Sequence, residues 1–356
     1  MRPDQWRIFK QIAKEGRPGQ VPCALIVDSP WIPGHLGITH FDYYDSPDVW
    51  FKSNLEIVEA FPDITMLPSW WVEYGMAIEP SSLGARALFH CDQPPGIIST
   101  MTSASDVARL PDVNPLTDGL MAFTLHRYRT MKQRVFDAGY TIPMVAARGP
   151  VCTAAFVRGL NDFLMDLLDN PSEAHQLLEL TTRLTIDWLT SQVEAIGPSV
   201  EGLLILDDIP GLMSRNHYLE FAHPYLTAVF QAFPKEWVKV YHNDANTRPV
   251  LDLLPDTGFD VLNWGKTIDL GHVAQATGGR VCLLGNLDPL EIGVRGTPEE
   301  VEEGTRLLVE TWRSAGRQTR WIFSLGGGVS PGMPGENIAA ISRALRIADS
   351  GLRISD

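Results

Sequence analysis

The amino-acid sequence predicts an α/β fold in which eight parallel strands alternate with helices and close into a single (β/α)8 barrel. Eight short apolar runs recur along the 356 residues, and their apolar residues are nearly continuous, as in strands buried on both faces. Helical patterns lie between the runs; this alternation indicates a parallel sheet, and eight repeats indicate closure. The predicted strands are Ala24–Val27, Ile64–Leu67, Pro143–Ala146, Leu203–Leu206, Val238–Tyr241, Asp260–Leu262, Val281–Leu284 and Trp321–Phe323.

Two of the intervening helices have clear start signals. Asn170 followed by Pro171 supplies a cap and a first-turn proline, and the apolar stripe after them runs on until Gly197. The tetrapeptide 297–300, Thr-Pro-Glu-Glu, has the form of a capping box and predicts a helix that ends near Gly316.

We expect one domain over residues 1–356, with residues 1–20 as an N-terminal extension. The segment from about 31 to 95 fits the repeating pattern worst, because it is rich in tryptophan, tyrosine and proline and shows no long helical period. We expect this segment to form an insertion or lid over the barrel mouth.

The composition excludes some classes of partner. The formal net charge of −14 argues against nucleic acid or an anionic membrane surface, since neither would meet a basic patch. No apolar signal-peptide core opens the chain, and no segment approaches the roughly 20 apolar residues of a membrane span. The four cysteines lie far apart without a Cys-x-x-Cys pair, which indicates reduced thiols. We expect a cytoplasmic protein, and a homodimer stays open.

The active site of such a barrel lies at the carboxyl ends of the strands, so residues directly after the apolar runs are candidates by position. His242 and Asp244 are two apart, so both could face one ligand or metal; alternatively, the imidazole makes a purely structural hydrogen bond. Of the adjacent Asp207 and Asp208, one should face inward while the other caps a helix or pairs with an arginine. The candidates by position are Asp28, Arg148, Asp207, Asp208, His242, Asn243, Asp244, Asn263, Asn286 and Asp288.

Four residues near strand ends have more specific interpretations. Arg148 suits bidentate binding of an anionic substrate group, or equally the neutralisation of an aspartate inside the barrel. Asp288 precedes a proline, as residues that organise a turn often do. Trp31 and Trp264 are candidates to contact a flat, aromatic ligand.

Several segments occur in a recognisable order: Asp207-Asp208-Ile209, Tyr218–Phe221 with Pro224–Leu226, His242-Asn243-Asp244, Gly285–Pro289 with Gly296–Val301, and Gly332–Ile338. In this order the chain resembles the uroporphyrinogen decarboxylase superfamily, over nearly its whole length. The resemblance implies a TIM barrel. The superfamily includes the decarboxylase itself, the corrinoid-dependent methyltransferases, and relatives such as methionine synthase.

The chain departs from the decarboxylase pattern at the first strand. The decarboxylase carries an arginine-rich Met-Arg-Gln-Ala-Gly-Arg signature for a substrate with many carboxylates, whereas this chain has Val27-Asp28-Ser29-Pro30-Trp31. An acidic, arginine-poor mouth is poorly suited to an octa-anionic tetrapyrrole. Decarboxylation is therefore the lesser hypothesis.

The chain also departs from the methyltransferases with thiol acceptors, whose zinc is held by a His-x-Cys pair and a later cysteine. His242 matches the histidine, but Asp244 and Gly327 stand where the two cysteines would be. Imidazole and carboxylate donors make a harder site than thiolates do, and such a site prefers oxygen ligands. Some relatives hold zinc through carboxylates and a histidine, which implies as candidate ligands Asp208, Glu220, His223, His242 and Asp244.

The resemblance thus implies an O-demethylase component that moves a methyl group from a methoxylated, aromatic substrate to the Co(I) of cobalamin, a corrinoid carried on a partner protein. His242 and Asp244, with Asp207 or Asp208, would assist the leaving oxygen. The substrate would contact Asp28, Trp31, Arg148, Asn243, Trp264 and Asn286. The alternatives are a decarboxylase of a smaller acid, a methyltransferase with an amine, thioether or betaine donor, and a noncatalytic binding protein.

Overall fold

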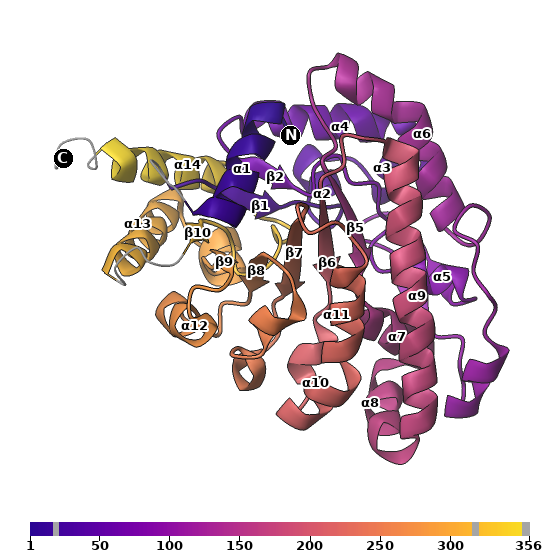
Figure 1. Cartoon of the computed structure of the whole chain (residues 1–356). Coiled ribbons are helices and arrows are strands. Elements are labelled where there is room, and N and C mark those ends of the chain that lie inside the picture. Colours follow the sequence, from indigo (N-terminus) through magenta and orange to yellow (C-terminus); the bar gives the residue numbers. More distant parts are fainter. Residues whose placement is uncertain (17–20, 315–319, 351–356) are drawn as a thin grey trace.

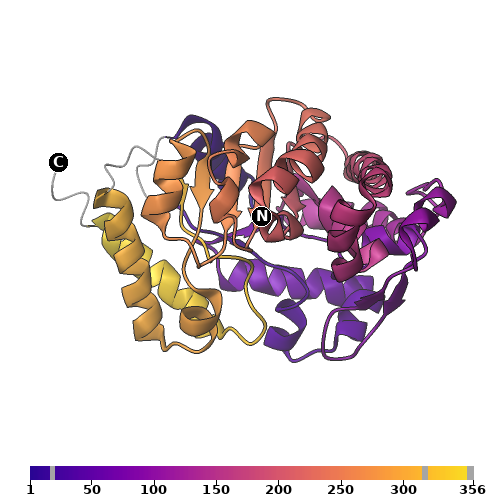
Figure 2. The ribbon, with the colours of Figure 1, turned by 90° about the horizontal axis from the view of Figure 1, so that it is seen from below.

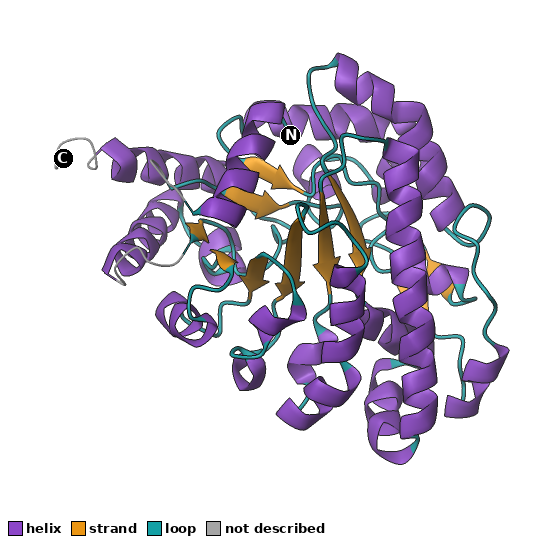
Figure 3. Cartoon of the chain, in the orientation of Figure 1, coloured by secondary structure: helices purple, strands orange, loops and turns teal. Residues whose placement is uncertain are grey.

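A ring of helices surrounds a core of strands in the computed structural model, which describes residues 1–16, 21–314 and 320–350 (Figures 1 and 3). The eight predicted strands are confirmed, with small shifts at their ends. They are β1 (Ala24–Ile26), β2 (Thr65–Leu67), β5 (Met144–Arg148), β6 (Gly202–Leu206), β7 (Val238–Asn243), β8 (Val261–Trp264), β9 (Cys282–Leu284) and β10 (Trp321–Ile322).

The strands form the parallel barrel in two groups. Six of them pair in the order β10-β9-β8-β7-β6-β5, and β1 pairs with β2. Backbone bonds from Ala24 N to Phe323 O (3.0 Å) and from Val329 N to Ile26 O (2.9 Å) join the two groups on one side. On the other side Met1 lies between them, since its carbonyl accepts from Thr141 N at 2.9 Å and its ammonium group donates to Ser69 Oγ.

Where the predicted helix ends fall within the described residues, the helices begin and end as the cap signals predict. The helix after Asn170 runs from Pro171 to Ile196 and stops at Gly197. The Thr297 capping box is confirmed, whereas the predicted end at Gly316 lies outside the described residues. The helices between strands are α2 (Ile32–Leu36), α3 (His40–Asp45), α4 (Pro47–Ala60), α5 (Ile78–Ser82), α6 (Met121–Asp137), α7 (Pro150–Arg158), α8 (Leu160–Asp169), α9 (Pro171–Ile196), α10 (Arg215–Phe221), α11 (His223–Gln231), α12 (Leu270–Thr277) and α13 (Pro298–Ser314), with α14 (Gly335–Ser350) after β10.

Residues 31–95, expected as an insertion or lid without a long helix, are largely part of the barrel. They contain α4 and β2, the first helix and second strand of the repeat. The additions are short helices and an antiparallel hairpin, β3 (Arg86–Leu88) with β4 (Gly96–Ile98). The insertion is therefore smaller than that range. No helix within the described residues is both long and apolar enough to cross a bilayer.

Side chains along each strand alternate between the barrel interior and the helices outside. On β6, Leu204 and Leu206 belong to the interior core, whereas Leu203 and Ile205 belong to the core beneath the helices. By the same two-residue period, Val240 and the other even-numbered residues of β7 point into the barrel interior. This period decides which residues beyond each strand face the mouth.

Helix α1 (Pro3–Glu15) closes the end of the barrel at which the strands begin. Its buried Trp6, Phe9 and Ile12 belong to the interior core. The Trp6 indole donates to Glu201 Oε2 (2.8 Å), just before β6, and Lys14 pairs with Asp260 (2.8 Å), just before β8. Within the predicted N-terminal extension, α1 thus forms the floor of the barrel.

We expect Trp6→Ala to lower the free energy of unfolding by about 3–5 kcal/mol, because it removes a buried aromatic ring and leaves a cavity. Urea denaturation followed by fluorescence or circular dichroism would measure the loss. Ile8→Ala, at a residue of the same helix that is 42% exposed, should change stability by less than about 0.5 kcal/mol. Equal losses in the two variants would contradict the assignment of α1 as the floor.

Candidate active site at the barrel mouth

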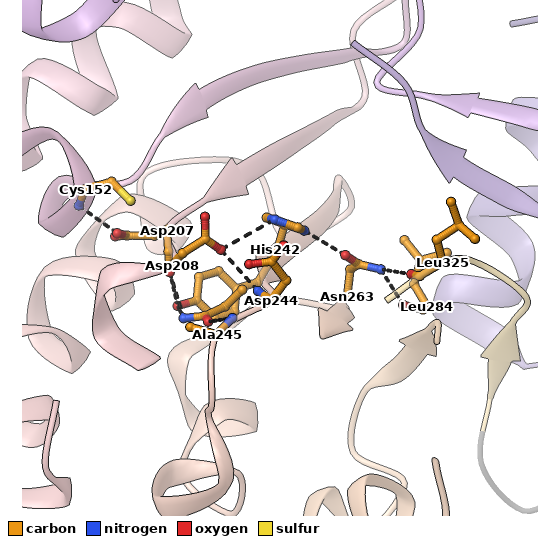
Figure 4. A network of polar contacts seen from close by, with 11 residues as sticks. Cys152, Asp207, Asp208, His242, Asp244, Ala245, Asn263, Leu284 and Leu325 are labelled. Atoms are coloured by element: carbon orange, nitrogen blue, oxygen red, sulfur yellow. Dashed lines mark hydrogen bonds and ion pairs between the residues drawn. The ribbon is translucent and has the colours of Figure 1, made fainter. Parts of the chain in front are cut away.

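Three side chains meet at the carboxyl ends of β6 and β7. Asp208 follows β6, His242 lies on β7 and Asp244 follows it, and their ligand atoms all lie within 4.8 Å of one another. His242 is 5% exposed, Asp208 is intermediate and Asp244 is exposed. Figure 4 shows the Asp208 carboxylate beside both the imidazole and the backbone nitrogen of Asp244, with a dashed line to each. All three belong to the five candidate ligands predicted from the sequence, and they form the one group of this kind in the described part of the chain.

Distances within this cluster show that the imidazole is held at both nitrogens. His242 Nε2 lies 3.5 Å from Asp208 Oδ1, and His242 Nδ1 lies 2.7 Å from Asn263 Oδ1. The backbone N–H of Asp244 donates to Asp208 Oδ1 at 3.1 Å, which fixes that carboxylate beside the ring. One nitrogen of the imidazole therefore faces the Asp208 carboxylate, and the other faces Asn263.

The electrostatics of the cluster favour a positive charge or a proton. Burial and the neighbouring Asp208 carboxylate raise the pKa of Asp244, and His242 opposes the rise. Two adjacent carboxylates relieve their repulsion by binding a cation or by sharing a proton. Oxygen donors with one imidazole nitrogen fit zinc or a harder divalent ion, and none of the four cysteines belongs to the group.

Glycine loops approach the cluster closely. A Cβ built on Gly327 would lie 3.1 Å from Asp244 Oδ2, and its φ of +129° disfavours other residues. A Cβ on Gly265, after β8, would lie 2.1 Å from the Asp244 carbonyl oxygen. Larger residues at these two positions would thus clash with Asp244, so both loops approach it through their backbones.

Asp207, predicted as a catalytic residue, lies outside this cluster. Its carboxylate accepts from Val151 N (3.2 Å) and Cys152 N (2.7 Å), so it caps helix α7. A Cβ on Gly149 would lie 2.1 Å from Asp207 Oδ2, so only glycine fits there. Burial raises the pKa of Asp207 to about 7, which the helix N–H groups oppose. Asp208 is therefore the member of the pair that belongs to the cluster.

Four predicted substrate contacts are buried and satisfied by the protein itself. Asn243 bonds Asp207 O and Ala245 N, and Asn286 donates to Ile268 O at 2.8 Å. The Trp31 indole donates to Met333 O, and the Trp264 indole donates to Ile268 O. These side chains hold loops together, and the prediction that they contact substrate is not supported by their positions.

Glu220 and His223, the more distant candidate ligands, also lie outside the cluster. Glu220 on α10 faces His175 at 3.6 Å, and the His223 ring packs edge-on against Tyr218. Both therefore belong to the helical layer. Asp288 organises the turn after β9, as predicted, by accepting from Leu290 N and Glu291 N and pairing with Lys266.

A second group of charges lies at the ends of β1 and β5. The Arg148 guanidinium stands 5.6 Å from the Trp71 ring and donates to Gly75 O, and it is close enough to Asp28 and Asp244 to oppose the rise in their pKa. Burial and the neighbouring Glu73 carboxylate raise the pKa of Asp28 to about 8. Arg148 therefore lies near both Asp28, which follows β1, and Asp244, which follows β7.

Glu73 and Glu79 are buried carboxylates that the sequence reasoning missed. Glu73 accepts from Ser29 N at 2.7 Å, and Glu79 accepts from Arg148 N at 2.8 Å. Both lie several residues after β2, beyond the positions that directly follow a strand. The sequence signal that could have identified these two residues is an acidic residue within an otherwise apolar and aromatic stretch.

The barrel and the carboxylate–imidazole cluster at its mouth define a (β/α)8 protein with an enzyme-like site. A sequence model described as Uroporphyrinogen decarboxylase (URO-D) matches residues 34–347, so the chain belongs to the uroporphyrinogen decarboxylase family.

Relatives named uroporphyrinogen decarboxylase share moderate identity with this chain. That of Chloroherpeton thalassium is 28% identical, covering 81% of this chain and 78% of its own. That of Chlorobaculum parvum is 32% identical over 175 residues, so the match spans 48% of either chain.

Solved structures confirm the fold. A methyltransferase from Methanosarcina mazei superposes with a TM-score of 0.81 at 19% identity, covering 96% of this chain and 97% of that one. A B12-independent methionine synthase from Shewanella sp. W3-18-1 gives a TM-score of 0.57 at 9% identity, covering 94% and 98%. Identities this low show the shared fold alone.

The raised pKa of Asp28 predicts a pH-dependent effect of Asp28→Asn. Because the folded state favours the protonated carboxyl, the wild type loses stability as pH rises from about 4 to about 8. The variant has no such group, so its free energy of unfolding should exceed that of the wild type by a margin that grows over this window, reaching about 1 kcal/mol or more at alkaline pH. Urea denaturation at a series of pH values would measure the margin.

The matched control is Asp256→Asn, which alters an exposed aspartate paired with Arg280. Its effect should stay within about 0.5 kcal/mol at every pH. A margin for Asp28→Asn that is constant or shrinks as pH rises would contradict the prediction.

Proposed function

We propose that this chain is a methyltransferase that moves a methyl group from a methoxylated, aromatic substrate to the Co(I) of a corrinoid protein. The observation that carries the proposal is the cluster of Asp208, His242 and Asp244, in which hard oxygen and imidazole donors converge without a thiolate. Such donors suit chemistry at an ether oxygen rather than activation of a thiol. The name of the Methanosarcina mazei structure supports the same class of reaction.

The reaction requires help at the leaving oxygen. The electron pair of Co(I) forms the cobalt–carbon bond while the carbon–oxygen bond breaks, and the oxygen departs with that bonding pair as an aryloxide, which then takes a proton. Negative charge develops at the oxygen in the transition state, so a positive group placed there speeds the reaction. The cluster is built to hold such a group.

Asp208, His242 and Asp244 are the residues that would hold a divalent cation, zinc being the leading candidate. A bound cation would act as a Lewis acid that lowers the charge on the departing oxygen. Without a cation, the imidazolium form of His242 would donate the proton as a general acid. Either way the chain supplies a fixed positive centre at one side of the mouth.

Arg148 is the candidate to orient the substrate. It is 5% exposed, and among the described residues its guanidinium donates one hydrogen bond, to Gly75 O at 3.3 Å, so most of the guanidinium N–H groups are available. A planar guanidinium binds carboxylate or phenolate groups in two-point geometry. An anionic substituent on the aromatic ring would therefore be held across the mouth from the Asp208 side.

Two alternatives follow from specific observations. The names of the sequence relatives favour a decarboxylase, but the carboxylates Glu73, Asp208 and Asp244 near Arg148 would repel a polyanionic tetrapyrrole. The same acidic surroundings favour a cationic methyl donor such as a methylamine or betaine. A panel of donors separates these possibilities.

We expect the purified protein, supplied with reduced cobalamin and a panel of methoxyarenes, to convert cob(I)alamin to methylcob(III)alamin, measured by absorbance. Asp208→Asn and His242→Ala should each lower the rate about 10²–10³-fold, because the leaving oxygen loses its electrophilic partner. Asp256→Asn should leave the rate unchanged. Methylation only from amine or betaine donors, or carbon dioxide release from uroporphyrinogen without methylation, would replace the proposal with the corresponding alternative.

We expect metal analysis to find about one divalent ion per chain, and isothermal titration of chelator-treated protein to show one site. Asp208→Asn should weaken that site at least 10-fold, since one of three charged or imidazole ligands is lost. Glu220→Gln, at a carboxylate outside the cluster, is the matched control and should bind as the wild type does. A wild type that binds no ion would leave His242 as the general acid.

A further inference from the structure

Asn263 lies next to the cluster without belonging to its donor set. It is fully buried on β8 and is the register partner of His242 on β7, so both side chains point into the barrel. Its side chain contacts the imidazole on the side away from the carboxylates, as Figure 4 shows.

The amide of Asn263 can adopt only one orientation. Its Nδ2 group donates to Leu284 O at 2.7 Å and to Leu325 O at 3.1 Å, two backbone carbonyls that can only accept. Rotating the amide by 180° would place Oδ1 against both carbonyl oxygens and lose two buried hydrogen bonds. Oδ1 is therefore held facing His242 Nδ1, 2.7 Å away.

A fixed acceptor determines the tautomer of the imidazole. Since Oδ1 can only accept, His242 Nδ1 must carry the hydrogen, and in the neutral ring Nε2 then has the free lone pair. Nε2 is the atom that lies 3.5 Å from Asp208 Oδ1. We infer that Asn263 is a positioning residue that sets the Nδ1–H tautomer of His242 and aims Nε2 at Asp208 and Asp244.

This inference deepens the proposed function and rests on it for its purpose. A cation ligand needs an unprotonated nitrogen that faces the carboxylates, and a general acid needs its donating nitrogen on that same side. Groups that hold the remote nitrogen of a ligating histidine typically affect metal affinity by about 10–100-fold. The backbone carbonyls of Leu284 in β9 and Leu325 after β10 thus orient His242 through the side-chain amide of Asn263.

The test is the tautomer of His242 in chelator-treated protein, read from the ¹⁵N shifts of both ring nitrogens in alkaline buffer, where imidazoles are neutral. The signal is assigned by its loss in His242→Gln. We expect the wild type to show the Nδ1–H form. An Nε2–H signal, or one averaged between the two forms, would overturn the inference.

Two substitutions separate positioning from stability. Asn263→Asp keeps an acceptor facing Nδ1 but loses both N–H donors, so it should lower the melting temperature yet retain the Nδ1–H form. Asn263→Ala removes the acceptor, so it should shift the signal towards Nε2–H and weaken Zn²⁺ binding by about 10–100-fold. A purely structural asparagine would leave the tautomer unchanged in Asn263→Ala, and that result would overturn the inference.

Asn243 provides the matched control, because it is an equally buried asparagine whose amide bonds Asp207 O and Ala245 N. Asn243→Ala should lower stability while the His242 tautomer stays that of the wild type. If it changed the tautomer as Asn263→Ala does, the assignment to Asn263 would be wrong. The tautomer is read without any methyl donor, so a failed methylation assay would overturn the proposed function and leave this inference standing.

Discussion

The arrangement of the site depends on one constraint, which is that side chains along a β-strand alternate between its two faces. Because the strands close into a barrel, one face of each strand points into the barrel and the other points towards the helices. Leu204 and Leu206 face inward on β6, so the interior row continues to Asp208 and the exterior row to Asp207. One of these aspartates faces the mouth and the other caps a helix outside the barrel. Adjacent carboxylates thus have unrelated environments.

The same alternation explains the other strands. On β7 the interior row leads through Val240 to His242 and Asp244, whereas Asn243 falls in the exterior row. On β8 Asn263 is interior, and Trp264 is exterior and packs beneath the helices. Because β6, β7 and β8 are neighbours in register, their interior residues meet at one place. Hydrogen bonding between neighbouring strands therefore brings together residues far apart in the sequence.

The positions of the strands could be predicted from the sequence, but the assignment of their faces could not. The interior row of β6 is leucine and its exterior row is leucine and isoleucine, so the apolar pattern does not distinguish them. Asn243 and Trp264 were consequently placed in the site by position alone. The helix α4 was missed for a related reason, since its buried face includes Ser53 and Asn54, which interrupt the apolar stripe. Asn54 is satisfied by the Tyr43 hydroxyl, a contact visible only in three dimensions.

Helix α1 and the cluster lie at opposite ends of the barrel, as the two perpendicular views of Figures 1 and 2 help to follow. Trp6 and its neighbours fill the amino-terminal end with packed side chains, so that end offers no passage. In the proposed reaction, the methyl donor and the Co(I) that attacks it would therefore both reach His242 from the carboxyl-terminal end of the strands. The donor would have to bind first, because a corrin ring placed over that end would block its entry.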